Sequence, residues 1–209
     1  IYIYDLATKQ TTNLTEENKG YDLDPVFSPD GSKIVWWSMK TDGFESEKHR
    51  LFIHDFNTGE TTDYSTQFDQ DATNFVWSPK GNKIYFLSCK EATYQIYSLS
   101  LETKQISQLT EGEHDYNTLA LAGNELIVSK TTHALPTELF SVNLVTKYEK
   151  QLTNVNKDVL SKIKLGKSEK RWVKTTDGKQ MLVWVILPPN FDSTKTYPAL
   201  LYCKGGPHQ

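Results

Sequence analysis

The sequence predicts an all-β fold, an incomplete β-propeller of four-stranded antiparallel blades, followed by the first strands of a domain of another kind. The first observation is a repeated hairpin, a short strand, a polar turn and a second strand ending in Leu-Thr or Tyr-Ser, whose copies contain Leu6, Phe56, Leu101 and Leu144. The second is the interval of roughly 40–50 residues between copies, which is typical of propeller blades. The third is that the pattern stops after Thr153.

A second hairpin lies between successive copies of the first. Residues 27–34 and 77–84 share Ser-Pro, a variable residue and Gly. This combination favours a tight turn, because Pro presets φ and Gly accepts a positive φ. Residues 119–126 are a degraded copy without the Pro. Each repeat therefore holds four strands, which predicts blades at 22–66, 71–110 and 114–153 after half a blade at 1–15.

The alternation of apolar residues along these strands predicts which side chains face the core. We expect these side chains to be held inside the blades: Val26, Ile34, Trp36, Phe52, Val76, Ile84, Phe86, Ile96 and Leu139. A closed propeller usually has about 4–8 blades, and unpaired edge strands invite aggregation. We therefore expect residues 1–153 to be the carboxyl-terminal part of a larger propeller.

The residue pattern of the sequence changes after the repeats. Residues 154–170 are polar and lysine-rich, which predicts a linker with about one turn of helix, and residues 171–209 are predicted to begin a second, truncated domain. Asp177-Gly178 is a strong hairpin signal between predicted strands at 172–175 and 181–187. The apolar run 199–203 predicts a strand buried in a mixed or parallel sheet.

This apolar run leads directly into Lys204, Gly205 and Gly206. In an α/β-hydrolase, a glycine-rich turn after a strand builds one wall of the oxyanion hole, and glycines let the backbone approach the substrate closely. On the Gly-Gly motif alone, an ordinary loop after a buried strand is the more common interpretation. The order of the surrounding segments makes the motif more specific.

The order of blades, linker, hairpin and Gly-Gly-Pro turn resembles the junction in the prolyl oligopeptidase family of serine peptidases. Residues 186–192 and 195–198 are particularly similar to its dipeptidyl peptidase branch. The resemblance implies that residues 171–209 begin an α/β-hydrolase domain. It also implies a fragment of a serine exopeptidase, dipeptidyl- or tripeptidyl-aminopeptidase-like, in which the propeller gates and helps to bind peptide substrates.

The same resemblance places the Ser-Asp-His triad downstream, because members carry the Ser in a G-x-S-x-G turn and this chain has none. We therefore expect the chain alone to be inactive and the parent protein to be a serine peptidase. Lys204 stands where family members have Tyr or His, so either its ammonium or only the backbone N–H groups would face the oxyanion. Family exopeptidases bind the substrate amino group with propeller carboxylates. Glu45 and Glu47 are candidates here, although charged loops are usually just solvated.

The amino-acid composition limits the classes of partner and cofactor that the chain is expected to bind. The chain has 23 basic and 26 acidic residues and a net charge of −3, and no basic patch suggests nucleic acid. No apolar stretch approaches the roughly 20 residues that span a bilayer. The two cysteines, Cys89 and Cys203, are too few for a disulfide framework or a cysteine-based metal site, and the five histidines lack metal-ligand spacing. We predict no cofactor or metal.

The expected partners are peptide substrates and the remainder of the protein's own propeller and hydrolase domain, with a homodimer left open. The resemblance favours the periplasm, and the cytoplasm stays open. The alternative function is a non-enzymatic Tol-like propeller that binds a protein partner, because Tol-system propellers share the Ser-Pro-Asp-Gly repeat. Residues 172–207 favour the peptidase, since a binding propeller has no use for a buried strand leading to Gly-Gly-Pro.

Overall fold

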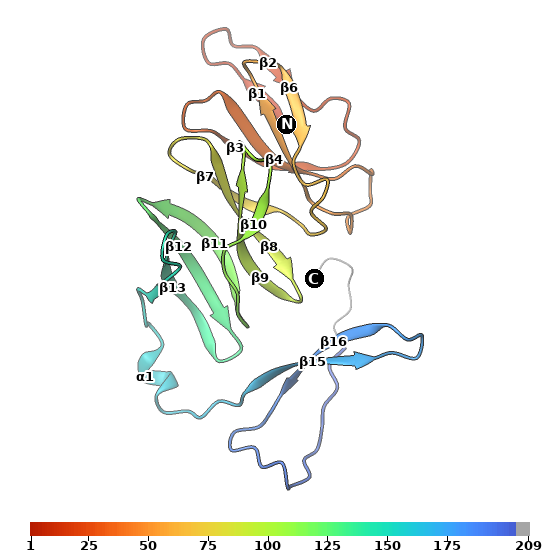
Figure 1. Cartoon of the computed structure of the whole chain (residues 1–209), viewed down its shortest axis with the longest axis vertical. Coiled ribbons are helices and arrows are strands. Elements are labelled where there is room, and N and C mark those ends of the chain that lie inside the picture. Colours follow the sequence, from red (N-terminus) through yellow and green to blue (C-terminus); the bar gives the residue numbers. More distant parts are fainter. Residues whose placement is uncertain (204–209) are drawn as a thin grey trace.

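The computed structural model describes residues 1–203, and these form three four-stranded antiparallel sheets, two two-stranded sheets and one short helix. Figure 1 shows the sheets following one another along the chain. A hairpin, β1 (Tyr2–Tyr4) and β2 (Thr11–Asn13), precedes the first sheet. The all-β fold with four-stranded antiparallel sheets is confirmed.

Each four-stranded sheet is a simple up-and-down meander. The first contains β3 (Asp22–Phe27), β4 (Lys33–Ser38), β5 (Arg50–Asp55) and β6 (Glu60–Asp63). The second contains β7 (Thr73–Trp77), β8 (Lys83–Lys90), β9 (Thr93–Ser100) and β10 (Ile106–Gln108). The third contains β11 (Asp115–Ala122), β12 (Glu125–Thr132), β13 (Leu135–Asn143) and β14 (Glu149–Gln151). The first strands β3, β7 and β11 contact one another in sequence, as blades do around a common axis.

The Leu-Thr or Tyr-Ser end of each repeat has a structural purpose. The hydroxyl of the last residue of each repeat accepts a hydrogen bond from a backbone N–H of the third strand of the sheet. Leu51 N donates to Ser65 Oγ at 2.9 Å in the first sheet, and Ile96 N donates to Thr110 Oγ1 at 2.9 Å in the second. Leu139 N donates to Thr153 Oγ1 at 2.8 Å in the third sheet. Because the outermost strand is short, this hydroxyl satisfies a backbone donor where the ladder of strand pairing ends.

The Ser-Pro-x-Gly turns close as their chemistry predicts. Gly31 and Gly81 have φ of 71° and 66°, which residues with a Cβ adopt only at a cost. The Ser28 and Ser78 hydroxyls accept Lys33 N and Lys83 N at 2.9 and 3.0 Å. These turns fix the register of β3 on β4 and of β7 on β8.

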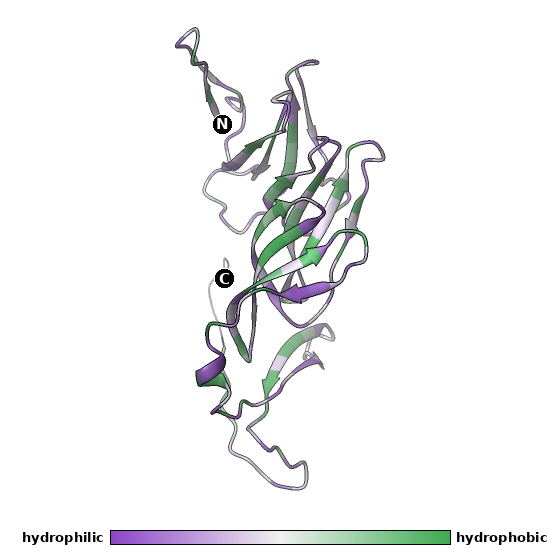
Figure 2. Ribbon diagram, turned by 90° about the vertical axis from the view of Figure 1, so that its left-hand side faces the viewer, coloured by the Kyte–Doolittle hydropathy of each residue, from purple (hydrophilic) through white to green (hydrophobic). Residues whose placement is uncertain are grey.

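Two hydrophobic clusters join the sheets. One packs the first sheet on the second through side chains such as Trp37, Leu51, Trp77 and Phe86. The other packs the second on the third through Leu87, Ile96, Tyr116, Val128 and Phe140. Figure 2 shows the hydrophobic residues concentrated along the strands of these stacked sheets. The sheets therefore support one another face to face.

One predicted core residue is wrong. Leu139 is 41% exposed, whereas Glu138 and Phe140 on either side of it are 2% and 7% exposed. The buried Glu138 carboxylate accepts the backbone N–H of Val155 at 2.7 Å and the hydroxyl of Thr153. These bonds offset the cost of burying a charge, so Glu138 shares the inward face of β13 with Phe140 and Val142, and Leu139 lies on the outer face. Val26, Phe52 and Val76 are only partly buried.

The segment after the sheets begins with α1 (Lys157–Leu160), the expected single helical turn. It leads to a hairpin of β15 (Ser168–Lys174) and β16 (Gln180–Ile186), which turns at Gly178 with φ of 83°. The strand expected at 199–203 does not form. Leu200, Leu201 and Tyr202 are exposed, because a buried strand needs partners and no strand within residues 1–203 pairs with it.

Candidate functional site

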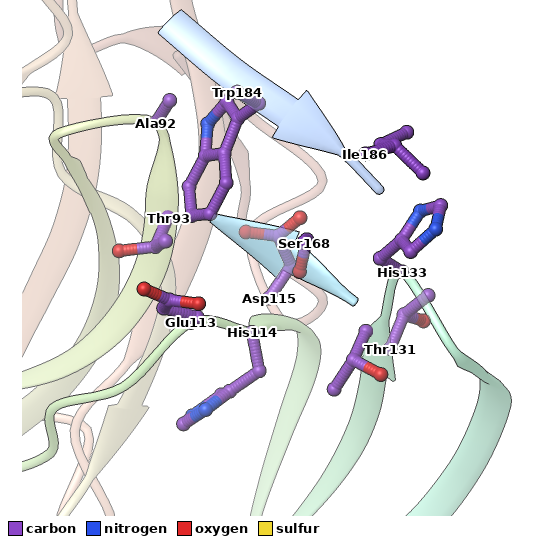
Figure 3. Close-up of a pocket in the computed structure, with 11 residues that line it drawn as sticks. Ala92, Thr93, Glu113, His114, Asp115, Thr131, His133, Ser168, Trp184 and Ile186 are labelled. Atoms are coloured by element: carbon purple, nitrogen blue, oxygen red, sulfur yellow. The ribbon is translucent and has the colours of Figure 1, made fainter. Parts of the chain in front are cut away.

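A cavity of about 300 Å³ lies where the loops of the second and third sheets meet the β15–β16 hairpin. Figure 3 shows Trp184 and Ile186 of the hairpin on one side and side chains of the sheet loops on the other. Its lining includes Ala92, Glu113, Asp115, His133, Ser168 and Trp184. We call it the junction cavity, because it joins the repeats to the segment that follows them.

The β8–β9 turn forms one edge of this cavity. Its two central residues, Glu91 and Ala92, both have left-handed backbone conformations, with φ of 51° and 58°. Such a tight turn suits two-residue hairpins but is usually made with Gly or Asn, so it is strained here. The strained turn presents Glu91 to Lys170 of β15, and their charged groups lie 2.5 Å apart. This ion pair connects the hairpin to the second sheet.

Two carboxylates lie across the cavity from the indole of Trp184 (Figure 3). Asp115, at the start of β11, accepts the backbone N–H of Tyr94 at 2.8 Å. Glu113 is held through its loop, because the buried Gln95 amide donates to the carbonyl oxygens of Gly112 and His114 at 3.1 and 3.0 Å. Carboxylates facing an aromatic ring attract an organic cation.

His114 lies between these carboxylates in the sequence. Burial lowers the pKa of its imidazole, and the nearby Lys130 lowers it further. The ring meets Tyr116 edge-on with centroids 4.5 Å apart, and its buried Nε2 has no hydrogen-bond partner within residues 1–203. His114 is therefore kept neutral at neutral pH.

A partly buried polar network supports the same loop. The Tyr116 hydroxyl donates to Glu149, which also pairs with Lys130 at 2.5 Å. Burial opposes ionisation of Glu149, but the hydrogen bonds from Lys130 and Tyr116 lower its pKa. Burial, together with the hydrogen bond to Glu149, raises the pKa of Tyr116. The first strand β11 is thus tied to the outermost strand β14, which fixes the loop that carries Glu113.

The site residues predicted from the sequence either lie away from the junction cavity or fall outside the residues that the structure describes. Glu47 accepts the backbone N–H groups of Lys40 and Thr41 at 2.5 and 2.7 Å, so it closes its own loop. Neither Glu47 nor Glu45 lines the junction cavity. Lys204, Gly205 and Gly206 lie outside the described residues.

Sequence reasoning missed the junction cavity. The stretch from Glu111 to Asp115 is as acidic as the loop that contains Glu45 and Glu47, and only its place at the start of an innermost strand distinguishes it. Within residues 1–203, no three metal-ligating side chains gather into a cluster. No helix in the same range reaches the length and apolarity that crossing a bilayer requires.

Comparison with known proteins places these observations in a family context. Residues 1–162 match the TolB beta propeller domain family. The whole chain is 44% identical over 207 residues to Dipeptidyl-peptidase 5 of Porphyromonas gingivalis, covering 99% of this chain and 30% of that protein. The chain thus spans about 30% of the length of that curated relative.

Two solved structures share the fold. An acylaminoacyl peptidase of Pyrococcus horikoshii superposes with a TM-score of 0.71 at 21% identity, over 90% of this chain and 28% of that one. TolB of Acinetobacter baumannii superposes with a TM-score of 0.58 at 16% identity, over 90% and 48%. At these identities the structures establish the fold alone.

Proposed function

We propose that this chain, which belongs to the TolB beta propeller domain family through residues 1–162, is part of a serine exopeptidase that removes dipeptides from peptide amino termini. Its likeness to Dipeptidyl-peptidase 5 confirms the resemblance to prolyl oligopeptidase-type peptidases. In this proposal residues 1–153 are blades that gate and help to bind the substrate. Residues 154–170 link them to the hydrolase domain that begins at residue 171, and the triad lies downstream.

The observation that carries the proposal is the extent of the similarity to the dipeptidyl peptidase. That similarity covers 99% of the chain, including the hairpin beyond the propeller match. The same hairpin supplies Ser168, Trp184 and Ile186 to the junction cavity. A propeller that only binds a protein partner has no need for such a hairpin.

We assign the junction cavity the role of holding the positively charged amino group of the substrate. Glu113 and Asp115 would accept hydrogen bonds from the ammonium, and the Trp184 ring would cover it. Charge-assisted bonds of this kind orient a ligand strongly. Fixing the amino terminus at a set distance from the nucleophile would explain release of two residues at a time, because positioning determines which bond is attacked.

The chemical step itself would use groups outside the described residues. A serine hydroxyl activated by His attacks the carbonyl, and backbone donors stabilise the oxyanion. Lys204, Gly205 and Gly206 stay our candidates for the oxyanion side. Glu45 and Glu47 become second candidates for the amino group, because the Glu47 carboxylate is already engaged with its own loop.

The alternative, a non-enzymatic Tol-like propeller, has the TolB fold similarity in its favour. The two functions differ in whether the complete protein carries an activated serine. Labelling that protein with a fluorophosphonate probe separates them, because the probe reacts with an activated serine and not with a binding propeller.

The role of the junction cavity is tested by Glu113→Gln and Asp115→Asn in the complete protein. Each should raise KM for a dipeptidyl fluorogenic amide about tenfold or more, since a charged hydrogen bond contributes roughly 1.5–3 kcal/mol. Glu102→Gln, an exposed turn residue of the same propeller, is the matched control and should not change KM. An unchanged KM in both cavity variants would show that this cavity does not bind the amino group of the substrate.

A further inference from the structure

The innermost strands of the three four-stranded sheets share an irregularity. The pairing of each first strand with the second strand slips, between Leu23 and Val26 in β3, between Thr73 and Val76 in β7, and between Tyr116 and Thr118 in β11. Each slip contains an Asp or Asn, namely Asp24, Asn74 and Asn117. A β-bulge re-aims one side chain and leaves local backbone groups unpaired, and it is frequent near binding sites.

Two of these residues are also strained. Asp24 and Asn74 both have φ of 55°, a left-handed conformation that is uncommon for residues other than Gly and that Asn and Asp tolerate best. Strained backbone tends to persist where it serves a site. The same device at the same place in successive sheets points to a common role.

The three bulges open onto one cavity of about 370 Å³. We call its surface the axial wall and define it by Asp24, Trp37, Asn74, Tyr94, Tyr116 and Asn117. Because β3, β7 and β11 contact one another in order, the three polar side chains form a row across neighbouring strands. This cavity is separate from the junction cavity, although Thr93 and Tyr94 of β9 contribute to one each.

The polar groups of the axial wall are only partly satisfied. Asp24 accepts the indole N–H of Trp37 at 2.8 Å, and the Asn117 amide donates to Thr131 Oγ1 at 3.1 Å. The Asn74 carboxamide is exposed and makes no hydrogen bond within residues 1–203. His49, stacked on Trp37 with centroids 4.1 Å apart, keeps a buried Nδ1 without a partner in the same range. The exposed Asn74 carboxamide is therefore the group whose donors and acceptor are available to a ligand.

We propose that the axial wall binds an extended peptide segment, the part of a substrate that lies away from the bond being cleaved. A carboxamide offers one acceptor and two donors, as a peptide group offers its own donor and acceptor, so a row of Asx side chains matches a main chain. Tyr94, which is 41% exposed, offers a flat surface for a side chain. The wall has a carboxylate and, among its described lining residues, no Lys or Arg, which disfavours phosphate-bearing ligands.

This inference rests on the proposed function, and its test separates the two. The complete protein is compared with an Asn74→Gly/Asn117→Ala variant, where Gly keeps the left-handed backbone of residue 74 while removing its side chain. The substrates are a dipeptidyl fluorogenic amide and an unmodified peptide of ten residues. The control variant is Asn57→Ala, an exposed turn residue on the outer side of the first sheet.

The variant should raise KM for the ten-residue peptide about five- to tenfold, which corresponds to the loss of about one or two hydrogen bonds. It should leave kcat/KM for the dipeptidyl amide unchanged. Equal losses on both substrates, or no loss on either, would overturn the inference. Absence of activity on the dipeptidyl amide in the unmodified protein would contradict the proposed function instead.

Binding is measured independently of turnover by the fluorescence anisotropy of a labelled ten-residue peptide added to the same proteins. A Kd that weakens about five- to tenfold in the double variant and not in Asn57→Ala supports the axial wall, whether or not the protein hydrolyses the peptide. An unchanged Kd would contradict it. Coincident thermal unfolding curves would establish that the variant is folded.

Discussion

His114 illustrates how a single residue responds to its position. Its imidazole is half-buried beside Tyr116 and near Lys130, and both burial and the neighbouring positive charge lower its pKa. The unfolded chain, with an ordinary His pKa of about 6.5, therefore takes up a proton first as the pH falls. Stability linked to His114 is present above that value and is lost as the pH falls below it.

We expect the free energy of unfolding to fall between about pH 7.5 and pH 5.5, and His114→Gln to weaken that dependence. Urea unfolding at the two pH values measures it. His133→Gln is the control, because His133 lines the same cavity but is exposed. The same pH dependence in the unmodified protein and in His114→Gln would show that other groups cause it.

The repeat ends show what an element needs beyond its apolar pattern. Thr110 accepts the backbone N–H of Ile96 and donates to the buried Gln95 carboxamide at 2.9 Å. Gln95 in turn holds the loop that carries Glu113. A residue that looks like a repeat marker in the sequence thus connects the sheet to the candidate site.

Thr110→Val should lower the free energy of unfolding by about 1–3 kcal/mol, because the change leaves a buried donor and a buried acceptor unsatisfied while keeping the β-branched shape. Denaturant unfolding measures this loss. Thr103→Val, in the exposed turn before β10, should change stability by less than about 0.5 kcal/mol. A cost below that value for Thr110→Val would mean that water replaces its hydroxyl.

The β15–β16 hairpin is held by few contacts with the sheets. Lys170 and Glu91 form the ion pair that connects them, and both side chains are partly exposed. An exposed pair contributes little, about 0–1 kcal/mol, so this contact should be easily opened. The turn at Glu91 and Ala92 closes the β8–β9 hairpin, in which Lys90 pairs with Thr93, and it also presents the carboxylate to Lys170.

Reversing one charge, Glu91→Lys, should speed hydrogen exchange of the hairpin amides several-fold, and Glu91→Lys/Lys170→Glu should restore the original rates. Raising the salt concentration should reduce the difference, because exposed charges are screened. If neither substitution changed the exchange rates in residues 168–186, packing around Trp184 alone would hold the hairpin.

Across the whole molecule, the turns were predictable because their chemistry is local. Ser28, Gly31, Ser78 and Gly81 act within their own hairpins, so the sequence contains the whole cause. The outward facing of Leu139 follows from the alternation of Phe140 and Val142, which are buried on the opposite face of β13. The burial of Glu138 was not predictable, because it depends on backbone donors from the segment after the last strand. Long-range pairing of this kind leaves no periodic signal.

The candidate sites were unpredictable for a related reason. Glu113 and Asp115 become neighbours of Trp184 only after the hairpin folds back on the sheets. The bulges at Asp24 and Asn74 likewise have no marker other than a residue type that is common in turns. The predicted strand at 199–203 has a clear apolar marker in the sequence but does not form. An apolar run indicates burial, but it does not specify the partner strands that would provide that burial.

The central proposal is that this chain is part of a peptidase that recognises a free peptide amino terminus. The most direct measurement compares hydrolysis of one dipeptidyl fluorogenic amide by the complete protein with hydrolysis of its amino-acetylated form. Acetylation removes the charge that the carboxylates would bind, so kcat/KM should fall about 100-fold or more. Equal hydrolysis of both forms, or hydrolysis of neither, would contradict the account.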